Sequence, residues 1–277
     1  MENVNSQKTE QIEAAKRLQD NLNKIKKKVI ILSGKGGVGK STVSVNVALG
    51  LAKNGYKVGI LDVDIHGPSI AKMLGIEDKK LLVAKSQKFP APIRVNDNLY
   101  AMSIANLISN PDEPIIWRGP IKIGVIKQFM QDINWPELDF LIIDSPPGTG
   151  DEPLSVVQTL NKVDGAIIVS TPQDIALLDA RKTIKFSQKM DVPILGIVEN
   201  MSTFACPHCG EAIDIFAGLG IEKAAKDFDV EIIGKIPLDP QIVKSGDSGI
   251  SHLENNQNST SAIAIEKMIK KIEEKIG

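Results

Sequence analysis

A glycine-rich segment that ends in Lys-Ser-Thr has the residue types that bind the phosphates of a nucleoside triphosphate. It fits the pattern G-x-x-x-x-G-K-[ST] at every fixed position and follows an apolar run at 29–32. Glycines let the backbone turn so that successive N–H groups and the next helix N-terminus face one anion. Lys40 then contacts the β- and γ-phosphates, Ser41 offers its hydroxyl to Mg²⁺, and Thr42 bonds the α-phosphate. The predicted phosphate-loop residues are Gly34, Lys35, Gly36, Gly37, Val38, Gly39, Lys40, Ser41 and Thr42.

Three aspartates follow predicted strands. Asp62 and Asp64 come after the apolar run at 57–61, and Asp144 ends the apolar run at 139–144. Carboxyl ends of parallel strands meet at the sheet edge that also carries a phosphate loop. We therefore expect Asp144 to hold the Mg²⁺ shell, Asp62 to support Mg²⁺ or its surroundings, and Asp64 to orient the attacking water. The alternative is that Asp62 and Asp64 only cap a helix that starts near Ser69.

The segment Ser-Pro-Pro-Gly-Thr-Gly-Asp-Glu at 145–152 has the composition of a loop that moves as a unit. Its two prolines stiffen the chain, while Gly148 and Gly150 act as pivots. A γ-phosphate bonded to the Gly148 N–H would therefore move the whole loop. The alternative is a plain connection between a strand and a helix.

Cys206 and Cys209 are the only cysteines, in the sequence Cys-Pro-His-Cys-Gly. In a reducing compartment this spacing indicates metal or redox chemistry. Zinc and [4Fe–4S] clusters both typically take four protein ligands, and one chain offers two thiolates. Two copies of the pair across a twofold axis would supply the four ligands. On ligand chemistry alone, zinc and iron–sulfur remain equally supported.

Composition and apolar periodicity define the expected domain organisation. The 277 residues suit one large α/β domain at 29–277, preceded by a helical extension at 1–28. A formal net charge of −1 and 4% aromatic residues disfavour a nucleic-acid partner. No apolar run is long enough to span a bilayer, so we expect a cytoplasmic protein. The amphipathic segment at 261–277 mixes lysines and glutamates on its polar face, which favours packing on the domain over membrane binding.

Four motifs occur in one order, and together they are similar to those of the Mrp/ApbC iron–sulfur carriers. That family is a branch of the deviant Walker A ATPases, with MinD, ParA and the nitrogenase iron protein. The resemblance implies a P-loop NTPase fold, in which a mostly parallel sheet is flanked by helices on both faces. It also implies that Lys35 reaches the partner's nucleotide across a homodimer. The motifs are K-G-G-V-G-K-S-T at 35–42, D-x-D-x-x-G-P-S at 62–69, D-S-P-P-G-T-G-D-E at 144–152 and C-P-x-C-G at 206–210.

The same resemblance indicates which residues contact the nucleotide base and which cluster the protein carries. Asn200 would read the adenine, with Pro237 and Asp239 in a second base-contacting loop, although turn chemistry explains the latter two equally well. The implied cofactors are ATP, Mg²⁺ and a [4Fe–4S] cluster at Cys206 and Cys209, with zinc as the alternative. The implied function is ATP-dependent transfer of the cluster to apoproteins, without nucleic acid or stable membrane association. A ParA/MinD-like positioning ATPase and a zinc-clipped regulatory ATPase are the competing functions.

Overall fold

The computed structural model describes residues 2–65, 67–79, 89–107, 119–206, 209, 211–216, 218 and 220–277. The elements in chain order are α1 (Glu2–Asn23), β1 (Ile25–Leu32), α2 (Lys40–Lys53), β2 (Val58–Asp62), α3 (Ile70–Met73), β3 (Ile93–Arg94), β4 (Leu99–Ser103), the 3₁₀ helix η1 (Ile104–Leu107), α4 (Gly119–Gln131), β5 (Leu138–Asp144), α5 (Asp151–Leu160), β6 (Gly165–Ser170), α6 (Asp174–Lys189), β7 (Ile194–Ala205), β8 (Ala212–Ile213), α7 (Gly220–Phe228), β9 (Ile232–Leu238), α8 (Pro240–Asp247), α9 (His252–Asn255) and α10 (Thr260–Ile276).

The strands of the described residues form one sheet in the order β3-β4-β2-β5-β1-β6-β7, with β9 on the other side of β7. Only β3 and β8 run antiparallel to their described neighbours, and β8 pairs with the far end of β7 through Phe204 and Ala205. The central strands are apolar runs, as expected for parallel strands covered on both faces. The prediction of a mostly parallel sheet flanked by helices is confirmed.

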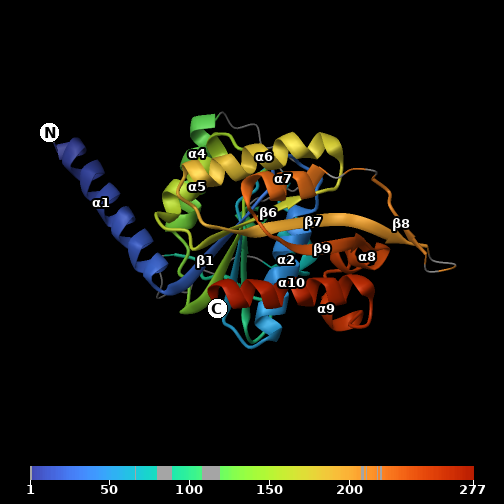
Figure 1. The fold of residues 1–277 in the computed structure, drawn as a ribbon. Helices are drawn as coiled ribbons and strands as arrows, with labels where there is room; N and C mark the ends of the chain where they lie inside the picture. Colours follow the sequence, from blue (N-terminus) through green and yellow to red (C-terminus); the bar gives the residue numbers. More distant parts are fainter. Residues whose placement is uncertain are drawn as a thin grey trace.

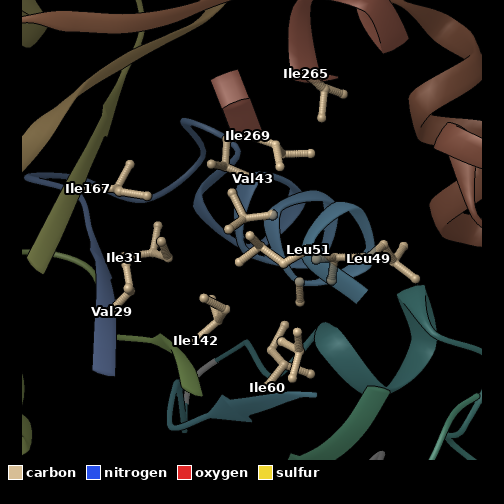
Figure 2. Close-up of a cluster of buried hydrophobic side chains, with 14 of the residues drawn as sticks. Val29, Ile31, Val43, Leu49, Leu51, Ile60, Ile142, Ile167, Ile265 and Ile269 are labelled. Atoms are coloured by element: carbon tan, nitrogen blue, oxygen red, sulfur yellow. The ribbon is translucent and has the colours of Figure 1, made fainter. Parts of the chain in front are cut away.

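Helices cover both faces of the sheet because side chains alternate along each strand. Val29 and Ile31 of β1 face a core shared with α2 and α10. Ile30 and Leu32 face the opposite core, which includes residues of α1, α4 and α5. Figure 1 shows these two helical layers, and Figure 2 shows the α2 side, where Val29 and Ile31 lie with Val43.

The last helix packs on the helix that follows the phosphate loop. Ile265, Met268, Ile269 and Ile272 of α10 are buried. A Cβ on Gly50 of α2 would lie 1.9 Å from Cδ1 of Ile269, so the two helices touch where α2 has no side chain. This favours the packing interpretation of residues 261–277. In the part of the chain that the structure describes, no helix is long and apolar enough to cross a membrane.

Two strands are longer than the sequence predicts. β1 begins at Ile25, so the predicted boundary between 28 and 29 falls inside it, and its first residues already pair with β5 through Ile25, Lys27 and Lys28. Lys26 lies 2.8 Å from Asp139, and the Lys28 N–H donates to Asp164. β7 continues to Ala205, whereas the apolar run ends near residue 198. Its polar second half still pairs with β9 and β8.

Candidate nucleotide site and cysteine hairpin

The phosphate loop lies between β1 and α2, as the sequence predicts. Gly37 and Gly39 have φ angles of 79° and 82°, a left-handed conformation that favours glycine. A Cβ on Gly34 would lie 2.5 Å from the Asp179 carbonyl oxygen of α6, so this position has no room for a side chain. A Cβ on Gly36 would meet open space. The loop therefore borders a cavity of about 670 Å³ that can receive phosphates.

Lys40 lies among carboxylates at the base of this cavity. Its Nζ is 2.8 Å from Oδ1 of Asp144 and 3.7 Å from Oδ2 of Asp64, and the residue is only 6% exposed. The contact with Asp144 is an ion pair whose angles do not suit a hydrogen bond, and the ammonium has no hydrogen bond among the described residues. The ammonium protons are therefore available to phosphate oxygens.

Asp144, at the end of β5, is fully buried and accepts from two serines of α2. Ser41 Oγ donates to its Oδ2 at 2.6 Å, and Ser44 Oγ donates to its Oδ1 at 2.7 Å. A serine hydroxyl and a carboxylate that meet beside a phosphate loop are oxygen donors of the kind that Mg²⁺ prefers. The donor set thus fits the predicted Mg²⁺ site at Ser41 and Asp144.

Asp62 and Asp64 differ in position although they are two residues apart. Asp64 lines the phosphate-loop cavity. Asp62 is fully buried and accepts from Ser103 Oγ at 2.9 Å and from the N–H groups of Asp64 and Ile70. Burial, and then the nearby charge of Asp144, raise the pKa of Asp62 to about 8. Asp62 therefore holds the start of α3, as the capping interpretation expected, and its support of Mg²⁺ stays a prediction.

The segment after β5 is connected to the phosphate loop. The Gly148 N–H, predicted to bind the γ-phosphate, donates to the Ser33 carbonyl at 2.7 Å. Gly148 has a φ of 95°, so a residue with a side chain would be strained there. A phosphate that took this N–H would have to displace the Ser33 carbonyl. Movement of residues 145–152 on phosphate binding stays a prediction.

Lys35 points to α6 within its own chain. Its Nζ donates to Oε1 of Gln173, the N-cap residue of that helix, at 3.0 Å. Lys35 also lines the phosphate-loop cavity. In the single chain, this lysine is therefore held at the rim of the cavity by a neutral amide.

The three residues predicted to contact the base are not together on the phosphate-loop cavity. Asn200 Nδ2 donates to the Val38 carbonyl at 2.9 Å, so its amide contacts the loop itself. Asp239 caps α8 by accepting from the Gln241 N–H, and also accepts from Ser261 Oγ. Pro237 lines a separate cavity of about 870 Å³. The turn-chemistry interpretation therefore suits Asp239 better than base contact does. Two other residues of α8, Ile242 and Val243, line the phosphate-loop cavity.

The cysteines lie at the tip of the β7–β8 hairpin. The Cys206 N–H donates to the Glu211 carbonyl at 2.9 Å, which closes the hairpin. Cys209 is exposed, and Cys206 is partly exposed. Residues 207, 208 and 210 of this motif, like His66 of the second motif, lie outside the described residues. Among the residues that are described, no group of three or more His, Cys, Asp or Glu side chains could hold a metal ion.

Several site residues are not evident from the motifs. Ser44 follows Lys40 by one helical turn, so the helical period was a usable signal for it. Ser103 and Gln173 reach the site from β4 and α6, and no local pattern indicates them.

His252 does not belong to the cysteine motif. Its buried ring bonds to Ser261 and Asn256, which lie far from the cysteines in the sequence.

A parallel sheet, a glycine loop between β1 and α2, and an aspartate of β5 beside the loop lysine define a P-loop NTPase. The family model described as "ParA: NUBPL iron-transfer P-loop NTPase" matches residues 24–273. The chain belongs to this family, and the resemblance to iron–sulfur carriers inferred from the motifs is confirmed.

Named relatives agree with the family. An "Iron-sulfur cluster carrier protein" of Methanocaldococcus jannaschii is 47% identical over 260 residues, 94% of this chain and 88% of that protein. A "Cytosolic Fe-S cluster assembly factor NUBP2 homolog" of Dictyostelium discoideum is 47% identical over 90% of this chain and 94% of its own length. A nucleotide-binding protein of Archaeoglobus fulgidus, solved with ADP, has 37% identity and a TM-score of 0.76, covering 90% and 95% of the two chains. MinD of Pyrococcus horikoshii, at 22% identity and a TM-score of 0.60, shares the fold.

Proposed function

We propose that this protein is an ATP-hydrolysing carrier that holds a [4Fe–4S] cluster between two copies of the chain and transfers it to apoproteins of the cytoplasm. The observation that carries the proposal is the position of Cys206 and Cys209 at the tip of a hairpin whose strand β7 also contacts the phosphate loop. The printed names of the relatives, a cluster carrier and a cytosolic assembly factor, support it.

The nucleotide end would bind and hydrolyse ATP. Glycines of the loop would present N–H groups to the phosphates, and Lys40 would move from its acidic partners to the β- and γ-phosphates. Mg²⁺, held by Ser41 and Asp144, would neutralise charge on the phosphate oxygens. Asp64 lies close enough to Lys40 to orient a water molecule near the γ-phosphate. The base site remains a proposal for Asn200 and Pro237, with Ile242 and Val243 as added candidates.

A homodimer would complete both ends of the molecule. Lys35 would leave Gln173 and reach the nucleotide of the other copy, as the family resemblance implies. At the hairpin, Cys206 and Cys209 of two copies would give four thiolates, which is the ligand number of a [4Fe–4S] cluster. The cluster is then cargo, and apoproteins that lack it are the partners.

Anaerobic reconstitution with iron and sulfide tests this function. The expected dimer carries one cluster, hence about two iron atoms per chain, and activates an apo-ferredoxin or apo-aconitase type client. Cys206→Ser and Cys209→Ser should each lose the cluster and the transfer activity but keep ADP binding. Ser202→Ala, in the same strand, is the matched control and should keep both. Full client activation by Cys206→Ser would contradict the carrier function.

Metal analysis and binding assays separate the two competing functions. Stoichiometric zinc that iron does not replace during anaerobic reconstitution would favour a zinc-clipped regulatory ATPase, because the same two thiolates per chain suit zinc. A ParA/MinD-like positioning ATPase would bind DNA or lipid vesicles and would not need either cysteine.

A further inference from the structure

Asn200 of β7 packs against Gly39, the last glycine of the phosphate loop, and the end of the Met201 side chain lies near the same position. Asn200 Nδ2 donates to the neighbouring Val38 carbonyl at 2.9 Å. A Cβ on Gly39 would lie 2.1 Å from that Nδ2 and 3.9 Å from Cε of Met201. The loop and β7 therefore fit together only because position 39 is a glycine. A shift of the loop at this point must displace Asn200 or break its bond.

The backbone of β7 departs from regular strand geometry at the same place. Met201 has a φ of 57°, a left-handed conformation that is uncommon for a residue with a side chain and often marks functional sites. The pairing of β7 with β9 also shifts register between Asn200 and Phe204. This irregularity interrupts the alternation of side chains, so consecutive residues can face the loop. The contact with the loop and the irregular backbone thus coincide.

Beyond Asn200, β7 extends past its neighbour on one side. β6 ends at Ser170, which pairs with Glu199, so the following residues of β7 have β9 and β8 as their paired strands. Figure 1 shows this part of β7 reaching outward to β8. Cys206 comes six residues after Asn200, a span of about 20 Å in an extended strand. A small change of direction at Met201 would therefore displace the cysteines by a larger amount.

We propose that Asn200 is a positioning residue that transmits the state of the phosphate loop through β7 to Cys206 and Cys209. Nucleotide binding changes the position of Val38 and Gly39, the bonded amide follows, and the irregular backbone at Met201 turns this into a displacement of the hairpin. The inference deepens the proposed carrier function and rests on it for its biological meaning. The mechanical link itself requires only that the loop binds nucleotide.

Thiol labelling of the metal-free, full-length protein tests the link without any cluster. Iodoacetamide modification of Cys206 and Cys209 is followed by mass spectrometry with and without saturating Mg²⁺-ADP and a non-hydrolysable ATP analogue. In the wild type, nucleotide should change the labelling rate of at least one cysteine by about fivefold or more, the lower end of common coupling factors. Asn200→Ala, and Asn200→Leu of similar side-chain size, should both remove this change.

Asn46→Ala is the matched control. Asn46 is 4% exposed against 5% for Asn200, and its Nδ2 also donates to a carbonyl of the phosphate loop, that of Thr42, but it has no bond to β7. Asn46→Ala should therefore keep the nucleotide-dependent change. Saturating ADP separates positioning from base recognition, because a residue that only binds adenine would lose affinity and regain the full labelling change at saturation.

Three results would overturn the inference. They are a wild-type labelling rate that nucleotide does not alter, an Asn200→Leu protein that keeps the full change, and an Asn46→Ala protein that loses it equally. Loading the wild type with iron and sulfide, beside the labelling experiment, distinguishes the carrier function from the link through Asn200. If the wild type holds no cluster but shows the labelling change, the carrier function fails and the link stands. If it transfers a cluster without any labelling change, the link fails and the carrier function stands.

Discussion

The nucleotide end and the hairpin end of this protein differ in how much of each site one chain supplies. At the nucleotide end, a buried aspartate accepts from two serines, and the loop lysine already lies 2.8 Å from it. At the hairpin, two cysteines are joined to the sheet by short pairings, and one of them is exposed. The first site has its charges in place before nucleotide binds. The second would gain the other two of its four ligands from a partner, so we expect assembly to control it.

The largest expected effect comes from Lys40→Ala. Because the variant removes the charge that contacts the β- and γ-phosphates, ATP hydrolysis should fall by about a hundredfold or more. Loading of iron at Cys206 and Cys209 in the absence of nucleotide should remain near the wild-type level, because Lys40 is not part of the β7–β8 hairpin that carries the cysteines. Phosphate release and iron content measure the two ends separately. Lys53→Ala, at the exposed end of the same helix, is the control. Loss of iron loading in Lys40→Ala would remove the separation of the two ends.

A subunit-mixing experiment asks whether the nucleotide end is also incomplete in one chain. Lys35→Ala and Asp64→Asn should each be inactive, the first because its partner lacks the lysine, the second because the water is not oriented. An equal mixture would form heterodimers in about half of the molecules, each with one complete site, and so regain about a quarter of the wild-type activity. Continued inactivity after verified subunit exchange would mean that Lys35 acts within its own chain.

The smallest expected effect concerns His252 and the pH dependence of stability. Burial lowers the pKa of His252, opposed in part by the charge of Asp239, so the folded protein binds this proton less readily than the unfolded chain does. The free energy of unfolding should therefore decrease as the pH falls below about 6.5, with a slope that corresponds to the uptake of at most about one proton on unfolding. Urea unfolding at pH 7.5 and 5.5 would measure the loss, which His252→Gln should reduce. An equal loss in both proteins would show that His252 does not cause the pH dependence of stability.

The sequence predicts the nucleotide end well because its chemistry is local. The loop lysine, its serine and the aspartate at the end of β5 are each fixed by the strand or helix next to them in the chain. Ser103 and Gln173 were missed because sheet order, not sequence spacing, brings β4 and α6 to the site. For Asp239 the sequence leaves base contact and turn chemistry equally open, because the same Pro-x-Asp-Pro segment also suits a helix cap, and the cap is the contact that the structure contains.

The length of β7 shows a different limit of sequence interpretation. Its apolar run stops at residue 198, and the polar residues that follow look like a loop. They form a strand because β9 and β8 pair with their backbone, and the side chains of Asn200 and Ser202 are buried although they are polar. An edge of this kind has no hydrophobic pattern, so its extent depends on partners far along the chain. The contact of Asn200 with the phosphate loop could not be predicted for the same reason.

The two halves of β7 should also differ in how readily they open. Residues 197–199 are paired on both sides, with β6 and β9, and their backbone amides should exchange with deuterium only when the whole domain unfolds. Residues 204–206 are paired through a few bonds near the tip and should exchange through local opening of the hairpin. In the proposed carrier function, an apoprotein would take the cluster from the locally opened hairpin, while the sheet stays folded and the nucleotide stays bound.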